Sequence, residues 1–328
     1  MSDASGFQPP DNMTVPRYAG IPTFMRLPFV ADPTVLDIAM VGVPFDGAVT
    51  NRAGTRHGPR EVRNMSSLIR RVHHVTRIDP YENCKVGDAG DTPIVPMNLM
   101  KSLEMIEEFY KPLAAAGVMP LSCGGDHLIT LPIFRAIAGD RPLGMVQFDA
   151  HTDTADEGFG GEKLHHGTPF RRAVDEGLLD PKRTVQIGIR GSRGSADYSD
   201  FSHESGMRVI YIEEFYEIGI DRVIEEARRV IGDGPTYISF DVDGLDPVYA
   251  PGTGTPEIGG FTTYEAQRML RGLRGCNLVG ADVVEVSPPF DPSGNTALVG
   301  ATMMFEILCL LAEARNARDP NSSESIEV

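Results

Sequence analysis

The chain has 328 residues, and its 46 acidic residues outnumber its 30 basic residues, which gives a formal net charge of −16. A negative charge of this size repels nucleic acids and anionic membrane surfaces, so neither is expected as a partner. The length allows one large α/β domain or two smaller domains.

The two ends of the chain differ from its middle. The N-terminal stretch MSDASGFQPPDNMTVPRYAG is polar and rich in proline, and it lacks the charged and apolar regions of a secretory signal. We expect an N-terminal arm over residues 1–33 and a flexible tail over 317–328. No continuous apolar run reaches the roughly 18 residues that a membrane span needs. The four cysteines are widely separated and lie in apolar runs, which is typical of reduced core residues. These features predict a cytoplasmic protein.

Between the ends, strand-like and helix-like segments alternate. Helices are expected over 58–72, where Pro59 stands at a helix start, and over 98–116, where apolar residues recur every three or four positions. Eight segments have the continuous hydrophobicity of strands that are covered on both faces: 35–43, 84–90, 118–125, 143–150, 183–191, 207–215, 236–244 and 278–286. The alternation predicts one domain over 34–316, a three-layer α/β/α fold with a parallel sheet of about eight strands.

Polar side chains stand at the carboxyl ends of four predicted strands. They are His127, Asp149, His151, Asp153, Asp241, Asp243 and Glu285. In open parallel sheets ligands bind at this edge. No equal cluster of Lys or Arg accompanies these carboxylates, and an unpaired buried charge costs several kcal/mol or shifts its pKa until it is neutral. A bound cation would remove the conflict.

Six of these side chains, without Glu285, form a donor set of four carboxylates and two imidazoles. One tetrahedral zinc takes about four ligands and favours Cys or His, so the set is too large and too rich in oxygen for it. Two Mn²⁺ ions that share carboxylates would use the whole set, and Ni²⁺ is also compatible with it. A single-zinc deacetylase, which shares this fold type, is the rival class of enzyme. The additional donors His127 and Asp153 argue against it.

The segments GGDH, DAHTD and SFDVDGLDP resemble the three signatures of the ureohydrolase family, which includes arginase, agmatinase and the guanidino-acid hydrolases. The resemblance covers nearly the whole chain. It is strongest to bacterial guanidinopropionase and guanidinobutyrase, in segments such as NRAGTRHGPREVRN and HGTPFRRAVDEGLLDP. It implies a binuclear metal-dependent amidinohydrolase with an arginase/deacetylase-like fold. In this reaction a hydroxide between the two ions attacks the carbon of a guanidino compound, and urea and an amine are released.

The resemblance also implies roles for individual residues. The first ion would be held by His127, Asp149, Asp153 and Asp241, and the second by His151, Asp149, Asp241 and Asp243. His166 matches the histidine that protonates the leaving amine, and the ordinary pKa of histidine, about 6.5, allows both protonation states near neutrality. Glu285 matches the carboxylate that pairs with the substrate guanidinium, which a carboxylate can accept in bidentate fashion. The adjacent His165 is expected to have a structural role.

The substrate tail is less closely defined. Asn51 and Arg52 match a loop of the guanidino-acid hydrolases where an amide or cationic group would meet a substrate carboxylate, which favours 3-guanidinopropanoate. Gly158 stands where close relatives carry a bulky residue, and its missing side chain is expected to leave volume for a larger tail. The alternatives are 4-guanidinobutanoate, agmatine, guanidine and a substituted biguanide such as dimethylbiguanide (metformin).

Quaternary structure is expected from the resemblance alone. Members of the family form trimers and hexamers, so we expect a homo-trimer or homo-hexamer, or a mixed oligomer with a paralogous subunit. In a mixed oligomer this chain could also be a non-catalytic subunit, although its complete donor set argues against that role.

Overall fold

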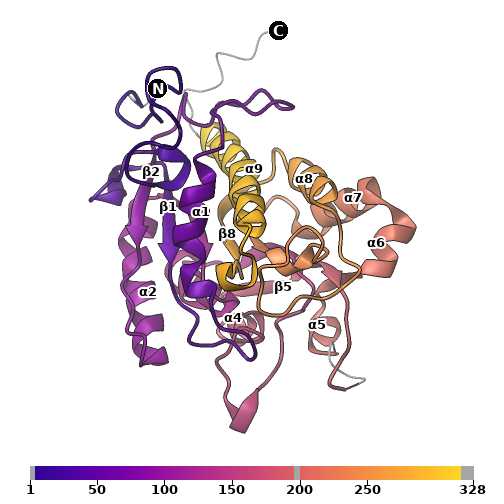
Figure 1. Ribbon diagram of the computed structural model, residues 1–328. Coiled ribbons are helices and arrows are strands. Elements are labelled where there is room, and N and C mark those ends of the chain that lie inside the picture. The colour runs from indigo at the N-terminus through magenta and orange to yellow at the C-terminus, as the bar shows by residue number, and fades with distance from the viewer. Residues whose placement is uncertain (1–3, 196–199, 319–328) are drawn as a thin grey trace.

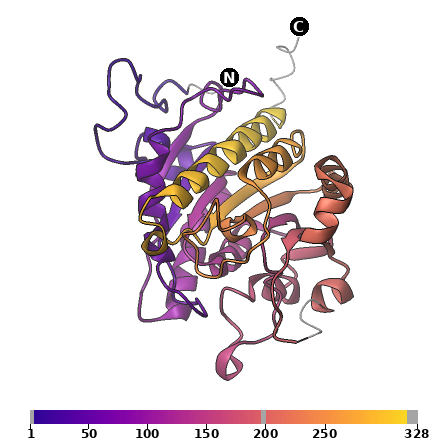
Figure 2. The ribbon, with the colours of Figure 1, turned by 45° about the vertical axis from the view of Figure 1, so that its right-hand side comes forward.

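Eight parallel strands form the sheet at the centre of the fold, in the order β2-β1-β3-β8-β7-β4-β5-β6 (Figures 1 and 2). The structure is a computed structural model that describes residues 4–195 and 200–318. The strands are β1 (Ile38–Val43), β2 (Val86–Asp91), β3 (Met119–Gly124), β4 (Leu143–Phe148), β5 (Leu179–Ile189), β6 (Arg208–Tyr211), β7 (Thr236–Asp241) and β8 (Leu278–Val284). The predicted parallel sheet is confirmed.

Helices connect these strands and cover the sheet. The α-helices of the described chain are α1 (Gly58–Ser66), α2 (Leu99–Ala115), α3 (Thr130–Ile137), α4 (Pro169–Asp175), α5 (Asp200–Ser205), α6 (Ile212–Ile218), α7 (Ile220–Ile231), α8 (Thr263–Arg271) and α9 (Asn295–Ala317). Short 3-10 turns are η1 (Phe24–Arg26), η2 (Pro33–Val35), η3 (Thr55–His57), η4 (His127–Ile129), η5 (Phe159–Gly161), η6 (Val242–Gly244) and η7 (Pro288–Phe290).

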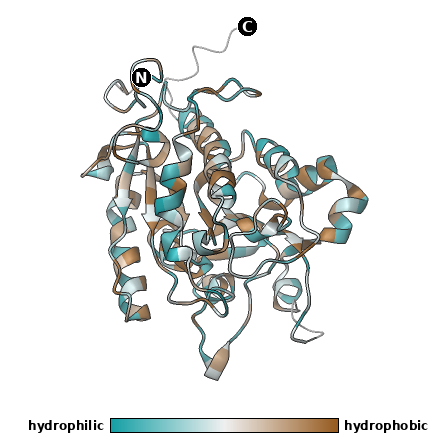
Figure 3. Cartoon of the chain, in the orientation of Figure 1, coloured by the Kyte–Doolittle hydropathy of each residue, from teal (hydrophilic) through white to brown (hydrophobic). Residues whose placement is uncertain are grey.

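The core has two parts, one on each face of the sheet. Ile38 and Met40 of β1 belong to one cluster of buried apolar side chains, and Ala39 and Val41 belong to the other. This alternation places the clusters on opposite faces. Helices α1, α7, α8 and α9 pack on the first face, and α2, α3 and α4 pack on the second. Hydrophobic and hydrophilic residues alternate along the helices that cover the sheet (Figure 3).

Two predicted elements end earlier than expected. The strand expected over 207–215 stops at Tyr211, and α6 begins at Ile212. Acidic residues Glu213 and Glu214 stand in the first turn of α6, where the helix dipole favours negative charge. Helix α1 ends at Ser66, whose hydroxyl donates to the carbonyl of Arg63 and thereby offers this carbonyl an alternative to the helical hydrogen bond.

The predicted N-terminal arm is attached to the domain where its sequence turns apolar. Phe24, Met25 and Leu27 are buried in the core. The backbone N–H of Phe24 donates to Asp88, at 2.8 Å, and that of Met25 donates to the hydroxyl of Ser66, also at 2.8 Å. The end of the arm is therefore part of the packed structure. The predicted C-terminal tail lies outside the described residues from 319 onward.

Helix α9 is long and apolar enough to cross a membrane by length and composition, although the sequence has no continuous apolar run of that length. In the fold, 83% of its most apolar window is buried. Glu306 interrupts the apolar run, and it is itself buried and pairs with Arg271 of α8. The helix packs on β8, α1 and α8, which is the position of a core helix (Figure 1).

Candidate metal centre

The six predicted donors come from the carboxyl ends of strands that lie close together in the sheet. His127 opens η4 after β3, and Asp149 follows β4 directly, with His151 and Asp153 in the next four residues. Asp241 ends β7 and Asp243 lies in η6. Strands β3, β8, β7 and β4 are consecutive in the sheet, so their carboxyl ends meet along one edge. The sequence prediction of convergence is confirmed by this geometry.

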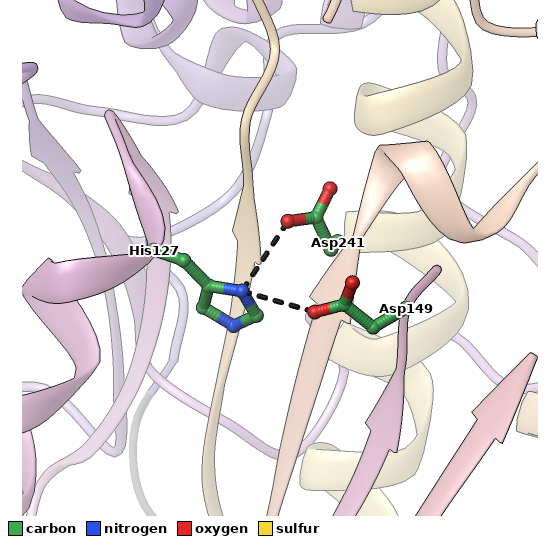
Figure 4. A group of neighbouring side chains, drawn as sticks. All are labelled: His127, Asp149 and Asp241. Atoms are coloured by element: carbon green, nitrogen blue, oxygen red, sulfur yellow. Dashed lines mark ion pairs between the residues drawn. The ribbon is translucent and has the colours of Figure 1, made fainter. Parts of the chain in front are cut away.

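The first donor group is centred on Nδ1 of His127. This nitrogen lies 3.1 Å from Asp149 Oδ2, 2.9 Å from Asp153 Oδ2 and 3.2 Å from Asp241 Oδ2. All four side chains are buried. Figure 4 shows the His127 ring facing Asp149 and Asp241 across the ends of their strands.

The second donor group shares Asp149 with the first. Nδ1 of His151 lies 3.5 Å from Asp149 Oδ1 and 3.2 Å from Asp243 Oδ2. The two oxygens of Asp149 thus face different groups. The His151 side chain is 22% exposed, whereas that of His127 is 1% exposed, so the second group lies nearer to solvent.

The charges of this cluster conflict when no cation is present. Burial raises the pKa of Asp241 well above its ordinary value, and the charges of Asp243 and Asp149 raise it further. Burial and the Asp149 charge raise the pKa of Asp153 to about 6. Burial opposes the charge on His127, but its hydrogen bonds with Asp149, Asp153 and Asp241 outweigh burial and raise its pKa. Without a cation, bound protons would therefore have to reduce the negative charge of this cluster.

The donor positions fit divalent cations. Bonds of about 2.0–2.2 Å at right angles place neighbouring donors about 3 Å apart, which agrees with the separations of 2.9 to 3.2 Å around His127. Nδ1 of His127 is a buried nitrogen without a hydrogen-bond partner of good geometry. Oxygen and nitrogen donors without thiolates suit Mn²⁺ and related ions. Two groups sharing one carboxylate fit a pair of ions better than the single zinc of the rival class.

A buried hydrogen-bond relay fixes the orientation of His127. Ser239 donates its hydroxyl hydrogen to Asp282 at 2.7 Å, so its oxygen accepts from Nε2 of His127 at 2.8 Å. In the neutral ring the other nitrogen, Nδ1, then carries the lone pair that would bind a metal ion. Thr130 donates to the second oxygen of Asp282 at 2.7 Å. Such outer partners set the tautomer and angle of a metal-binding histidine.

Glu285 connects the metal donors with His166. Its Oε1 accepts from the backbone N–H of His127 at 3.0 Å and from Nδ1 of His166 at 2.9 Å. Its Oε2 is buried without a partner in the described chain. Only Oε2 is therefore open to a substrate guanidinium, so the expected bidentate pairing is not favoured in this arrangement. Glu285 is itself buried, with 1% of its surface exposed.

Thr50 holds the other side of the His166 ring. Its backbone N–H lies 3.1 Å from Nε2, and its hydroxyl oxygen lies 2.7 Å from the same nitrogen. Because an N–H can only donate, Nε2 is the accepting nitrogen of the neutral ring in this arrangement, and Nδ1–H donates to Glu285. The backbone N–H of His166 also donates to the carbonyl of Ala48 at 3.0 Å. The loop that contains Thr50 thus positions the candidate proton shuttle.

Two site residues have backbone conformations that side chains other than glycine rarely adopt. The φ angle is +51° at Asp153 and +63° at Glu285. Such left-handed conformations cost of order 1–3 kcal/mol and persist where surrounding contacts impose them. Here the contacts are the His127 ring for Asp153 and the His127 N–H and His166 for Glu285.

Two of the three residues that were connected with the substrate tail, Asn51 and Gly158, lie in different surroundings. Asn51 is exposed beside Thr50, and its predicted contact with substrate stays a prediction. The volume expected at Gly158 is not free, because a Cβ there would lie 2.7 Å from both Cδ2 and Nε2 of His165. The ring of His165 fills this space and accepts from the Gly167 N–H at 3.1 Å. The expectation of open volume was wrong, because a glycine leaves no gap when a neighbouring ring occupies it.

A double-mutant cycle tests this packing. Gly158→Ala is expected to lower the free energy of unfolding by about 1–3 kcal/mol, because the added methyl group overlaps the His165 ring. In a His165→Ala background the same change should cost much less, since the ring is absent. Denaturant unfolding of the four proteins measures both costs. Equal costs in the two backgrounds would show that the ring and residue 158 do not compete for space.

A second prediction concerns the protonation of His166. Burial lowers its pKa, but the charge and hydrogen bond of Glu285 outweigh burial and raise the pKa to about 9 in the metal-free protein. This proton contributes folding stability that is complete below the ordinary pKa of 6.5 and is lost as the pH rises through about 9. An NMR titration of metal-free Glu285→Gln should show a lower His166 pKa than the wild type. An unchanged pKa would remove Glu285 as its cause.

Sequence reasoning missed three supporting residues. Thr50 precedes the two loop residues that were singled out, and no local pattern distinguishes it. Ser239 lies two residues before Asp241 on β7, so strand periodicity places both on one face and could have suggested contact with the donors. Asp282 is a carboxylate inside the apolar β8 segment, which was itself a signal of a buried partner.

Two donor groups that share a carboxylate, at the carboxyl edge of a parallel sheet, define a binuclear metallohydrolase. The arginase family profile matches residues 36–310. The chain is 66% identical to guanidinopropionase of Pseudomonas aeruginosa, over 94% of this chain and 96% of that protein. It is 47% identical to guanidinobutyrase of the same organism, over 94% of this chain and 98% of that protein.

A solved structure agrees with these sequence matches. Proclavaminate amidino hydrolase from Streptomyces clavuligerus superposes with a TM-score of 0.88 and 39% identity, covering 92% of this chain and all of that one (100%). The chain therefore belongs to the arginase family. It is a hydrolase of the ureohydrolase type, and the resemblance identified from the sequence motifs is confirmed.

Proposed function

We propose that this enzyme hydrolyses a small guanidino acid of the 3-guanidinopropanoate type to urea and an amine. The observation that carries the proposal is Asp149, whose two oxygens face two separate donor groups. The similarity to guanidinopropionase over nearly the whole chain supports the substrate class. We further propose two Mn²⁺ ions as the cofactor, with Ni²⁺ as the alternative, because the donors are carboxylate oxygens and imidazole nitrogens.

The donors would be divided between the ions as the family pattern implies. His127, Asp149, Asp153 and Asp241 would hold the first ion, and His151, Asp149, Asp241 and Asp243 would hold the second. When bound, such a pair of ions supplies a hydroxide nucleophile near neutral pH. The four carboxylates also supply the negative charge that attracts the two divalent ions.

The remaining chemistry belongs to protein side chains. Glu285 Oε2 would accept a hydrogen bond from the substrate guanidinium and hold its central carbon in place. After water has added to that carbon, the C–N bond to the tail breaks, and the departing nitrogen takes a proton. In its doubly protonated form, His166 would deliver this proton from Nε2–H, and the Nε2 contact with the Thr50 N–H would have to open for Nε2 to carry it. Thr50 would thus act as the resting partner of the proton shuttle.

A urea-release screen tests the proposal. It would compare 3-guanidinopropanoate, 4-guanidinobutanoate, agmatine, arginine, guanidine and dimethylbiguanide, each with Mn²⁺ and Ni²⁺ in parallel. We expect 3-guanidinopropanoate to have the highest kcat/KM. Faster turnover of a biguanide or of guanidine would contradict the proposed substrate but would agree with the proposed class of reaction. No turnover of any compound by protein that retains two ions would contradict the proposed function.

Assembly and location are proposed on the same basis. We propose a homo-trimer or homo-hexamer in the cytoplasm, with a mixed oligomer containing a paralogue as the alternative. Light scattering of the purified chain distinguishes these states. Activity that requires co-expression of a second, homologous chain would favour the mixed oligomer.

A further inference from the structure

Arg190 is a buried arginine directly after β5 that has no role in the proposed reaction. Its guanidinium donates to backbone carbonyls: Gly188 at 3.1 Å, Asp243 at 2.7 Å, Gly244 at 2.9 Å, Leu245 at 3.1 Å and Glu257 at 2.7 Å. The described chain gives it no carboxylate partner in an ion pair. An arginine presents five donors in a fixed plane, and here they are directed to backbone oxygens rather than to a charged group.

The carbonyls belong to segments that surround the second donor group. Three consecutive carbonyls lie in and after η6, which contains Asp243. The backbone N–H of Arg190 also donates to the carbonyl of Ala150, at 2.9 Å, between the donors Asp149 and His151. In turn, the Ala150 N–H donates to Asp243 Oδ1 at 3.1 Å. One residue thus joins the end of β5 to both segments that supply ligands to the second group.

The surrounding loop leaves room for the guanidinium. A Cβ at Gly260 would lie 2.5 Å from a guanidinium nitrogen of Arg190 and 2.5 Å from the backbone nitrogen of Asp246. The same loop contributes the Glu257 carbonyl, which accepts from Arg190. The loop over 251–260 therefore wraps around this side chain, and Arg190 fixes it to η6.

The first donor group has separate support that does not involve Arg190. His127 is oriented by Ser239 and Asp282, and its backbone is held by Glu285. The η6 turn is a single 3-10 turn and has few hydrogen bonds of its own. Without Arg190, three of its carbonyls would lose their buried donor, and Asp243 would be held by its remaining hydrogen bonds with Asp241, Ala150 and Thr255.

We propose that Arg190 is a positioning residue for the second metal ion, acting through the η6 backbone on Asp243. The inference rests on the proposed function and deepens it, since it states that one side chain, Arg190, holds the ligands of the second ion in position. It predicts that the two ions respond differently to the same substitution.

The test compares Arg190→Met with Arg183→Met. Arg183 lies inside β5, and its guanidinium also donates to backbone carbonyls, those of Ile231 at 2.9 Å and Pro235 at 3.1 Å. It is a matched control for the loss of a carbonyl-binding guanidinium away from the metal centre. Chelator-treated full-length protein would be titrated with Mn²⁺ by calorimetry, and the metal content after gel filtration would be measured by mass spectrometry.

We expect Arg190→Met to bind the first ion as the wild type does and the second ion about 10- to 100-fold more weakly. Arg183→Met should have a lower Tm and still bind both ions normally. Unchanged binding of both ions by folded Arg190→Met, or equal weakening of both, would overturn the assignment. If Arg190→Met does not fold, Arg190→Lys decides in the same assay, because one ammonium cannot reach all five carbonyls. A wild-type protein that binds only one ion would overturn the proposed function and this inference together.

Discussion

An Asp149→Ala variant is expected to retain neither metal ion and to lose turnover by at least about 10³-fold, because the hydroxide nucleophile depends on the two bound ions. Asp149 is the carboxylate that faces both donor groups, with Oδ2 3.1 Å from Nδ1 of His127 and Oδ1 3.5 Å from Nδ1 of His151. Its removal leaves each group with fewer donors and also removes the negative charge between them. Among the other donors, only Asp241 is likewise assigned to both ions.

Thermal unfolding with and without Mn²⁺ checks this expectation independently of activity. An ion at 100 times its Kd stabilises the folded protein by about 2.7 kcal/mol, so Mn²⁺ should raise the Tm of the wild type and leave that of Asp149→Ala unchanged. Asp221→Ala is a suitable control, since the Asp221 side chain is 80% exposed and its one ion pair in the described chain is with Arg268. A Mn²⁺-dependent rise in Tm for Asp149→Ala would contradict the shared-ligand assignment.

The metal-free Asp149→Ala protein need not be less stable than the metal-free wild type. Asp149 raises the pKa of both Asp153 and Asp241 by its charge. Removing it relieves part of this repulsion, so the cost of folding the empty site falls. The substitution thus separates two effects of the carboxylate cluster: its contribution to metal binding, and its unfavourable contribution to the folding free energy of the metal-free protein.

The fold was largely predictable because the strands are buried on both faces. Continuous hydrophobicity identified all eight strands, and the parallel order follows from the helices between them. The predicted boundary was wrong where an apolar strand pattern overlaps with residues that favour the start of a helix. At 207–215 the apolar pattern continues past Tyr211, but the two glutamates that follow favour a helix start. Boundaries of this kind depend on contacts that a pattern does not contain.

The site was predictable to the extent that strand geometry controls it. Alternate residues of a strand share a face, which was enough to bring Asp149, His151 and Asp153 to one edge. The partners of these residues were not predictable, because they are distant in sequence. Thr50 meets His166 across 116 positions, and Arg190 meets the η6 carbonyls across 53 to 55 positions. Gly158 was misjudged for a different reason: His165 is only seven residues away, but no local pattern shows that its ring turns back into this space.

Glu285 relates the metal half of the site to the proton-transfer half. A single oxygen of this carboxylate receives both the backbone N–H of His127 and the ring N–H of His166. A change at Glu285 would therefore disturb a metal ligand, the shuttle and the substrate contact together. His166 is a cleaner probe of proton transfer, since neither of its ring nitrogens is within hydrogen-bond distance of a predicted metal ligand in the described contacts.

His166→Ala is accordingly expected to keep both ions and to lose about 10²- to 10⁴-fold in kcat, the usual contribution of a general acid. The loss should be largest for substrates whose leaving amine is strongly basic, because such an amine cannot depart without a proton. Metal content and kcat would be measured on the same preparations. His203→Ala is a suitable control, since His203 is exposed and its ring hydrogen-bonds only to Tyr211 in the described contacts. Turnover near the wild-type rate would remove His166 from the mechanism. Loss of an ion would instead make His166 a residue that supports the metal centre. Asp149→Ala tests the formation of the nucleophile and His166→Ala tests the delivery of the proton, so the two variants together separate these two steps.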